Sequence, residues 1–272
     1  MIDLSVTIIA RNCKDVLIKC LDSVFTKIKD IEYEVLILDN GSEDGTGDAA
    51  INKYPSLILV TNKENNGVAP ARNQLIKMTK GKYILILDAD TEIVSGNFNS
   101  LLEFMDMHKD VGILGCNLVS LDNKSHPSVR TYPRPVHIFL RRLSYLGFVK
   151  NSRILREHHL ESFDKKEPGV VDFVEGAFQL IRREAIEKIG LLNERMFYGF
   201  EDADYCARME KDGYKVVYYP SFIVRHYLQG ITRKNPFNRM VYLHTKSYFT
   251  FYRLHKDLIK RKIKDKNAYK EI

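Results

Sequence analysis

Two groups of acidic residues carry the chemistry that this sequence can support. The first is Asp88-Ala89-Asp90, which directly follows the apolar run LIL and so places two carboxylates beside a buried segment. Such carboxylates repel each other and cost free energy to desolvate unless a positive group lies between them. Their hard oxygen atoms suit Mg²⁺ or Mn²⁺. The pair favours a cation site; the alternative is a solvated turn in which Asp90 or Thr91 caps a following helix.

The second group lies in the segment GFEDADYC, which contains Glu201, Asp202 and Asp204. Acids that open a helix are stabilised by the helix dipole, and this structural explanation suits Glu201 and Asp204. Three acids in four residues exceed what a cap needs, so one could act as a general base towards a hydroxyl. His226 ends the run SFIVRH; a lone histidine is more often structural, but an imidazole is also a metal ligand.

The elements that must position these residues alternate in the first half of the chain. Short apolar, β-branched runs predict strands, and helical spacing between them predicts helices over 15–27 and from Pro70 to Gly81. This alternation indicates an α/β fold with a doubly wound, mostly parallel, Rossmann-like sheet, which binds ligands outside the carboxyl ends of its strands. Asp39, Asp88 and Ala10-Arg11-Asn12 all fall at that edge. The predicted strands are 4–10, 33–39, 56–62 and 82–88.

The second half is less regular. Residues 120–168 predict a long loop region with short helices, and order returns at 170–181. Helices are expected over 182–190 and 201–213, followed by a strand over 214–220. From Phe237 onwards the chain is predicted to be helical, first aromatic and then strongly basic.

Composition narrows the class of protein. Four scattered cysteines form no CxxC pair, which favours a reduced, cytoplasmic chain without disulfides. No signal peptide or membrane-spanning run is recognisable. The net charge of +7 favours a polyanionic partner, such as a diphosphate, a nucleic acid or an anionic membrane surface.

Taken in order, several segments resemble an inverting family 2 glycosyltransferase with the GT-A fold, in the rhamnosyltransferase-like branch that builds bacterial surface polysaccharides. The resemblance covers roughly residues 4–228 and implies a GT-A domain over 1–228. Within it, 1–118 would bind the nucleotide sugar and 119–228 the acceptor, with a helical basic C-terminal extension over 229–272. The segments are VTIIARNCKDVLIKCLDSV, EVLILDNGSEDGT, NKENNGVAPARNQLIK, GKYILILDADTEI, GAFQLIRREAIEKIGLLNERMFYGFEDADYCARMEKDGYKVVYYP and VRH.

The resemblance implies roles for the acidic groups. Asp90 and His226 would hold Mn²⁺ or Mg²⁺ together with Asp88, which would also contact the ribose side. Asp202 would be the catalytic base, with Glu201 as its orienting neighbour or the alternative base.

The family pattern also implies contacts with the donor and the acceptor. Asp39 would bind the pyrimidine base, and Gly176 would let the acceptor approach the backbone. Asn66, Gly67 and Arg72 would close over base and diphosphate, although Arg72 could instead be a structural ion-pair residue. The other residues implied to line the nucleotide pocket are Ala10, Arg11, Asn12, Asp88 and Ala89.

The implied reaction moves a sugar from a UDP- or dTDP-linked donor to a hydroxyl of a glycan or a polyprenyl-diphosphate-linked acceptor. This chain has Asp88-Ala89-Asp90 where relatives often carry Asn-Pro-Asp, and it lacks tryptophan; Phe197, Tyr198 or Phe200 could replace an aromatic side chain near the acids. These departures leave the donor sugar open.

The basic segments suggest a further partner. Residues 253–270 and the stretch from Arg141 to Arg156 are rich in lysine and arginine, and aromatic residues precede the first of them. These features favour peripheral attachment to the inner face of the plasma membrane, although a solvated helix or a disordered tail would look similar.

Three other classes of protein remain as alternatives. A nucleotidyltransferase would need a glycine-rich phosphate loop, and IIARNCKD has no glycine. A non-catalytic sugar-nucleotide or polyanion-binding protein would not need both Asp90 and Asp202. A nucleic-acid binder would account for the charge but leaves the acids unexplained, so no nucleic-acid partner is expected.

Overall fold

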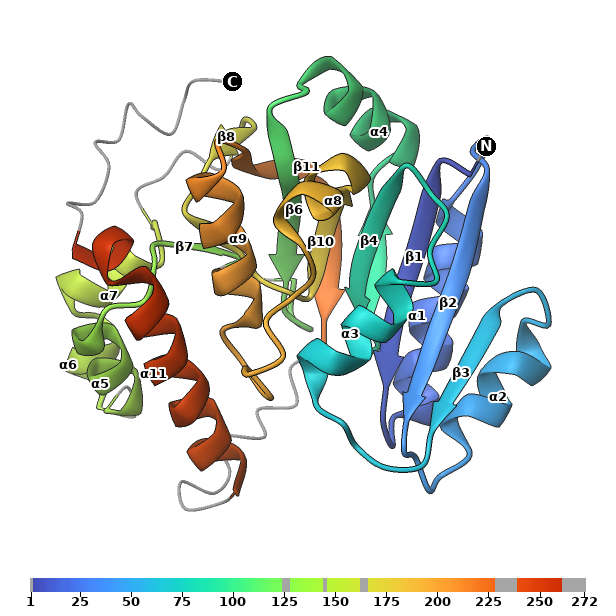
Figure 1. Cartoon of the computed structure of the whole chain (residues 1–272), viewed down its shortest axis with the longest axis horizontal. Coiled ribbons are helices and arrows are strands. Elements are labelled where there is room, and N and C mark those ends of the chain that lie inside the picture. The colour runs from blue at the N-terminus through green and yellow to red at the C-terminus, as the bar shows by residue number, and fades with distance from the viewer. Residues whose placement is uncertain (1, 124–127, 144–145, 162–165, 228–238, 261–272) are drawn as a thin grey trace.

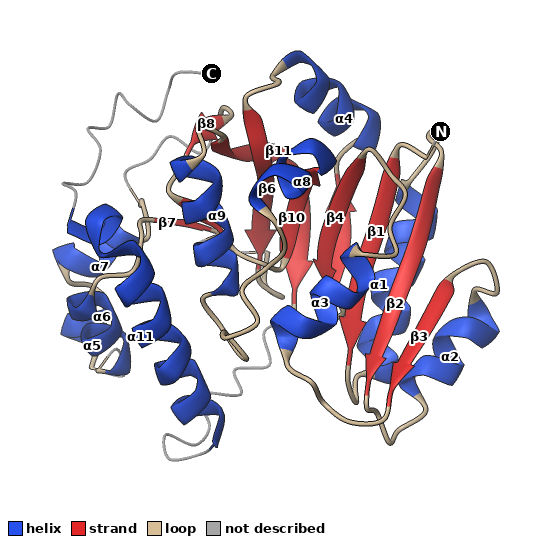
Figure 2. Cartoon of the chain, in the orientation of Figure 1, coloured by secondary structure: helices blue, strands red, loops and turns tan. Residues whose placement is uncertain are grey.

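A mixed β-sheet forms the centre of the molecule (Figures 1 and 2). The computed structural model describes residues 2–123, 128–143, 146–161, 166–227 and 239–260. The sheet has nine strands, eight of them in the order β3-β2-β1-β4-β10-β6-β11-β5, with β8 paired to β11. Its strands are β1 (Leu4–Ala10), β2 (Tyr33–Asn40), β3 (Ile58–Asn62), β4 (Tyr83–Asp88), β5 (Thr91–Ser95), β6 (Val111–Val119), β8 (Gly169–Val170), β10 (Phe178–Arg182) and β11 (Lys215–His226).

The first half of the sheet has the predicted parallel arrangement. β1 pairs in parallel with β2 and β4, and β2 pairs in parallel with β3. The register places Ala10 opposite Asp39 and Ile9 opposite Asp88. The ends of these three strands therefore share one edge, as expected.

Beyond β4 the sheet becomes mixed. β10 lies antiparallel to β4 and β6, whereas β11 is parallel to β6 and antiparallel to β5. β11 is longer than the predicted strand over 214–220. It passes Pro220 at an irregularity between Tyr219 and Ile223, where the ladder can tolerate a residue without an N–H group. This extension carries the strand to His226.

Helices cover both faces of the sheet. In Figure 1, α1 (Lys14–Lys27) lies behind the strands, and α3 (Val68–Ile76), α8 (Arg183–Ile189) and α9 (Glu201–Lys211) lie in front. Side chains of β4 point alternately to the two faces of the sheet and so contribute to two cores. Leu85 and Leu87 belong to one buried cluster, and Ile84 and Ile86 belong to the other. The other helices of the first half are α2 (Thr46–Lys53) and α4 (Phe98–Met107).

One predicted helix end is wrong. The helix expected to close on Gly81 ends at Ile76. Gly81 serves a different purpose, because a Cβ atom there would lie 2.6 Å from the backbone nitrogen of Ser5. The glycine thus permits close approach of the chain to β1 and does not cap the helix.

The second half adds short helices and a long C-terminal one. The described residues between 120 and 168 form short elements separated by loops, as predicted. The described C-terminal helix packs on α9. Tyr248 and Phe251 of that helix are buried in the same cluster as Tyr205 of α9. No helix in the described ranges is both long and apolar enough to cross a bilayer. The remaining elements are β7 (Val129–Arg130), α5 (Pro135–Arg142), α6 (Gly147–Lys150), α7 (Arg153–His158), β9 (Phe173–Val174) and α11 (Arg239–Lys260).

Candidate active site

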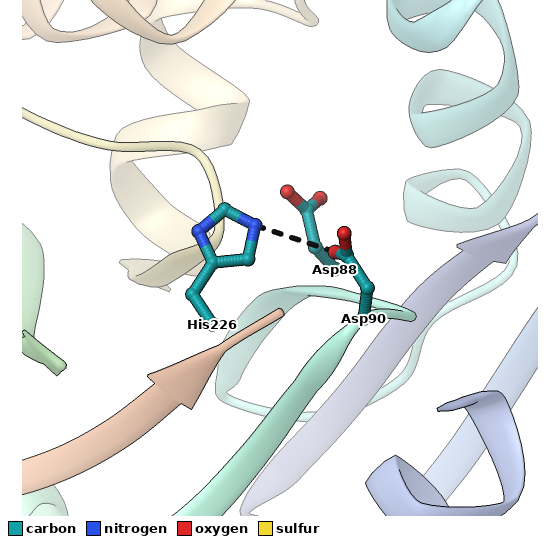
Figure 3. Close-up of side chains that lie close together, drawn as sticks. All are labelled: Asp88, Asp90 and His226. Atoms are coloured by element: carbon teal, nitrogen blue, oxygen red, sulfur yellow. Dashed lines mark ion pairs between the residues drawn. The ribbon is translucent and has the colours of Figure 1, made fainter. Parts of the chain in front are cut away.

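Asp88, Asp90 and His226 converge at the carboxyl edge of the sheet (Figure 3). One ligand atom from each side chain lies within 4.8 Å of the other two. His226 Nε2 is 3.3 Å from Asp90 Oδ1, and both side chains are mostly buried. The three side chains that the family pattern assigns to the cation therefore meet, although His226 comes from a distant part of the sequence.

Backbone pairing brings the three residues together. β4 ends at Asp88, whose carbonyl oxygen accepts a 2.7 Å hydrogen bond from the Thr91 hydroxyl. The chain then turns into β5, where Thr91 lies opposite His226 of β11, and the Tyr227 N–H donates to the Asp90 carbonyl at 2.8 Å. A strand therefore begins at Thr91, and the alternative of a helix cap at this position is wrong.

The electrostatics of this cluster favour a cation. Burial raises the pKa of Asp88, the neighbouring Asp90 charge raises it further, and Arg72 acts in the opposite direction. Burial alone would lower the pKa of His226, but its hydrogen bond to Asp90 and the charge of Asp88 bring it to about 9. Two carboxylates and one imidazole form an oxygen and nitrogen donor set that fits Mn²⁺ and also accepts Mg²⁺.

Arg72 lies between the two acidic groups and forms the ion pairs that were the alternative expected for it. Its side chain is only 4% exposed. Nη2 donates to Asp88 Oδ1 at 2.7 Å and to the Gly176 carbonyl at 2.9 Å, and Nη1 donates to Glu201 Oε1 at 3.1 Å. Burial would lower the pKa of Arg72, but Asp88, Glu201 and Asp202 raise it. The guanidinium therefore links the cation-binding acids to the second acidic group.

The two neighbouring acids of that group have different surroundings. Glu201 is buried, one of its oxygens pairs with Arg72, and its other oxygen has no hydrogen-bond partner in the described part of the chain. Burial and the charge of Asp202 raise the pKa of Glu201 to about 7. Asp202 is more accessible; its Oδ2 accepts from the Gly176 N–H at 3.1 Å and its Oδ1 from the Ala203 N–H at 2.8 Å. Burial raises its pKa, and these two hydrogen bonds oppose the rise.

The third acid, Asp204, is structural. It is fully buried and lies 2.8 Å from His255 Nε2 of α11 and 3.0 Å from Arg208 Nε.

Phe200, just before the acids, adopts a left-handed conformation with φ 69°. Such a conformation is costly for a bulky residue, and it directs the chain into α9 at the site.

The predicted nucleotide-binding residues form two loops at the same edge. Both Asp39 oxygens accept backbone hydrogen bonds, from Ser42 at 2.8 Å and Gly47 at 3.0 Å, so this carboxylate organises its own loop. Asn12 has a left-handed backbone, and its side chain accepts from the Glu43 N–H at 2.8 Å. Ala10 and Ala89 are buried, whereas Arg11 is exposed.

The second loop contains Asn66 and Gly67. The exposed Asn66 donates its N–H to the side chain of Asn40 at 3.2 Å. Gly67 has φ 90°, and a Cβ atom there would lie 2.7 Å from the Phe197 ring. Phe197, one of the aromatic residues suggested near the acids, therefore packs on this loop.

Two features of the site were not predicted. Gly176 packs closely against Arg72, because a Cβ atom there would lie 2.8 Å from Arg72 Nη1. Glu175 forms an ion pair with Arg130, and its charge acts on both Asp202 and His226. Glu175 lies directly before Gly176, which begins a segment that resembles the family pattern, and this was the available sequence signal.

Comparisons with known proteins identify the family of this chain. The family model "Glycosyl transferase family 2" matches residues 5–190. An N-acetylglucosaminyl-diphospho-decaprenol L-rhamnosyltransferase from Mycobacterium tuberculosis is 27% identical over 79% of this chain and 73% of its own length. An Escherichia coli UDP-Glc:alpha-D-GlcNAc-diphosphoundecaprenol beta-1,3-glucosyltransferase, WfaP, is 36% identical over 39% of this chain and 42% of its own.

Solved structures resemble the fold at lower identity. The crystal structure of GalNAc-T7 with UDP, GalNAc and Mn²⁺ aligns with a TM-score of 0.69 at 17% identity, over 96% of this chain and 50% of that one. Staphylococcus aureus TarS aligns with a TM-score of 0.60 at 15% identity, over 96% and 46%. The chain therefore belongs to glycosyl transferase family 2 and is a glycosyltransferase with the GT-A fold.

Proposed function

We propose that this enzyme transfers a sugar from a UDP- or dTDP-linked donor to a hydroxyl of a lipid-diphosphate-linked glycan, in cell-surface polysaccharide synthesis. The observation that carries the proposal is the meeting of two acid groups around Arg72, one with a cation donor set and one with an accessible carboxylate. The names of the two bacterial relatives, which specify diphospho-polyprenol acceptors, support the acceptor class.

Asp88, Asp90 and His226 would hold Mn²⁺ or Mg²⁺ beside the diphosphate of the donor. A bound divalent cation supplies charge neutralisation for the leaving diphosphate. Asp39 and the loops around Asn12 and Asn66 would enclose the nucleoside at the same edge of the sheet.

Asp202 is the proposed base. Its two oxygens are oriented by the Gly176 and Ala203 N–H groups, and its raised pKa suits proton acceptance. As the acceptor oxygen forms a bond to the anomeric carbon, Asp202 takes the hydroxyl proton and the bond to the diphosphate breaks. A single displacement of this kind inverts the anomeric configuration. Glu201 stays on Arg72 and positions α9.

The four cysteines are free, which suits a reducing compartment such as the cytoplasm. A lipid-linked acceptor would require the enzyme to work at a membrane surface. We therefore include an anionic membrane among its partners.

The proposal is tested by incubating the enzyme with UDP- and dTDP-sugars and a short-chain polyprenyl-diphosphate sugar, with Mn²⁺ or with EDTA. Mass spectrometry of the lipid product should show one added sugar residue only when the cation is present, and NMR should show an inverted anomeric centre. Transfer of the nucleoside monophosphate to the acceptor with release of a sugar 1-phosphate would instead identify a nucleotidyltransferase. Retention of configuration would contradict the single displacement.

A further inference from the structure

Helix α11 carries a stripe of alternating basic and aromatic side chains on its solvent face. These residues are three or four positions apart, so they lie on one side of the helix. All five are exposed, with Tyr242 at 67% and Phe249 at 60%. We call them the basic–aromatic stripe: Arg239, Tyr242, Lys246, Phe249 and Arg253.

The opposite side of α11 fixes this orientation. Tyr248 and Phe251 are buried in the core that α9 also lines. His255, where the helix kinks, is buried and lies 2.8 Å from the fully buried Asp204 of α9. Rotating the helix would break this pair and expose both aromatic rings, so the stripe must face outwards.

The charges of the stripe are not neutralised within the described part of the chain. Arg239, Lys246 and Arg253 form no ion pair with a described carboxylate, and the nearby Asp257 pairs with Lys211. A surface with three cations and no compensating acid attracts a polyanion.

Other exposed apolar residues gather at the same side of the molecule. Figure 1 shows α5, α6 and α7 together with α11 at the edge farthest from β3. Phe139 is 62% exposed and Phe148 is 77% exposed, with the exposed Arg153 and Arg156 on α7. Among the described residues, seven of the eleven large exposed apolar side chains lie on these four helices: Val136, Phe139, Phe148, Ile154, Tyr242, Phe249 and Leu254.

We propose that the basic–aromatic stripe docks the enzyme onto the headgroup region of an anionic phospholipid bilayer. Lysine and arginine are attracted to anionic headgroups, and aromatic side chains favour the boundary between headgroups and hydrocarbon. A fixed helix whose other face is buried lies along such a surface and does not span it.

The stripe is connected to the active site. The ring centroid of His244, on the same helix, lies 4.7 Å from that of Phe200. A Cβ atom on Gly199 would lie 2.7 Å from the His244 ring. These contacts join α11 to the segment just before Glu201 and Asp202. Docking through the stripe would therefore place the acid pair near the membrane, where a lipid-linked acceptor is held. This purpose rests on the proposed function, whereas the docking itself does not.

The test is sedimentation of the full chain with vesicles of phosphatidylcholine alone or phosphatidylcholine mixed with phosphatidylglycerol, without donor or acceptor. Lys246→Ala/Arg253→Ala should weaken binding to anionic vesicles about 25-fold, because each cation contributes about fivefold. Tyr242→Ser/Phe249→Ser should weaken it about tenfold through lost apolar burial. The matched controls are Lys27→Ala/Lys29→Ala and Met107→Ser, which alter exposed residues on α1, in the loop that follows it, and on α4.

Binding that requires phosphatidylglycerol, is lost in the stripe variants and is kept in both controls would support docking. Far-UV circular dichroism checks that α11 remains folded in each variant. No binding to anionic vesicles, or equal binding by stripe and control variants, would overturn the proposal. Stripe-dependent binding of poly(U) without vesicle binding would overturn it in favour of a nucleic-acid surface. Because no transfer is measured, failure here is distinct from failure of the proposed function.

Discussion

Asp88 and Glu201 are held by the same guanidinium. Arg72 Nη2 lies 2.7 Å from Asp88 and Arg72 Nη1 lies 3.1 Å from Glu201. Asp88 ends a central strand, whereas Glu201 begins a helix. The relative position of the cation site and the proposed base is thus set by one buried side chain.

Arg72→Met should destabilise the protein strongly, because it leaves two mostly buried carboxylates without their partner. Removing one member of a buried ion pair typically costs about 3–5 kcal/mol. The free energy of urea unfolding measures this loss, and Arg72→Lys should recover part of it. As a control, Arg153→Met removes an arginine whose side chain is 85% exposed, with no measurable change expected. An unchanged urea midpoint in Arg72→Met would show that the bridge does not stabilise the site.

Substitutions of Asp202 and Glu201 should affect different properties of the enzyme, the first its transfer rate and the second its stability. Asp202→Asn keeps the shape of the side chain but removes the proton acceptor, so we expect the transfer rate to fall about 10²–10⁴-fold. The affinity for the nucleoside diphosphate should stay the same. Glu201→Gln should chiefly lower stability, because it weakens the pair with Arg72. Steady-state kinetics and calorimetry of both variants provide the comparison. Full activity of Asp202→Asn with an inactive but stable Glu201→Gln would reverse the assignment of the base.

Two stacked histidines should make stability depend on pH. The His137 and His158 rings are buried with centroids 4.1 Å apart. Burial lowers the pKa of His137 from 6.5 to about 4, with a further contribution from nearby arginines. Burial and the neighbouring His137 lower the pKa of His158 well below its usual range.

Because both pKa values are depressed in the folded state, the buried neutral histidines contribute their full stability above pH 6.5. This contribution to the free energy of unfolding is lost as the pH falls towards 4, since the unfolded chain takes up protons first. The shifted pKa of His137 alone should lower the free energy of unfolding by about 2 kcal/mol when the pH falls from about 7.5 to about 5. Urea unfolding at the two pH values measures this loss. His137→Asn retains an acceptor for the Arg134 N–H and cannot titrate in this range, so its loss should be smaller. An identical pH dependence in wild type and His137→Asn would contradict the assignment.

The parallel half of the fold could be predicted because its signals are local. β-branched runs ending in Asp39 and Asp88 specify buried strands whose ends share an edge. The end of α3 could not be predicted in this way. A glycine at position 81 is typical of a helix C-cap. Here, however, glycine is needed because a side chain would collide with Ser5, and this contact depends on the tertiary structure.

The site shows the same division. Asp90 and Asp202 could be identified from spacing and family resemblance, although the assigned roles stay predictions. The partners of Arg72 could not be identified, because they come from β4, the loop before β10 and α9. The aromatic residues of α11 likewise look equivalent in the sequence. Only packing shows that Tyr248 and Phe251 are buried whereas Tyr242 and Phe249 are exposed.

The most direct test of the central claim is whether a nucleoside diphosphate binds this protein only together with a divalent cation held by Asp90. Thermal shift and calorimetry with UDP, dTDP, GDP and CDP, each with and without Mn²⁺, would be run on wild type and Asp90→Ala. Glu187→Ala, an exposed position on α8, is the control. A ligand at 100 times its Kd stabilises the native state by about 2.7 kcal/mol. We predict that UDP or dTDP stabilises the protein in this way when Mn²⁺ is present. The stabilisation should be kept in Glu187→Ala and lost in Asp90→Ala. Equal nucleotide binding with and without Mn²⁺, or in Asp90→Ala, would contradict the account.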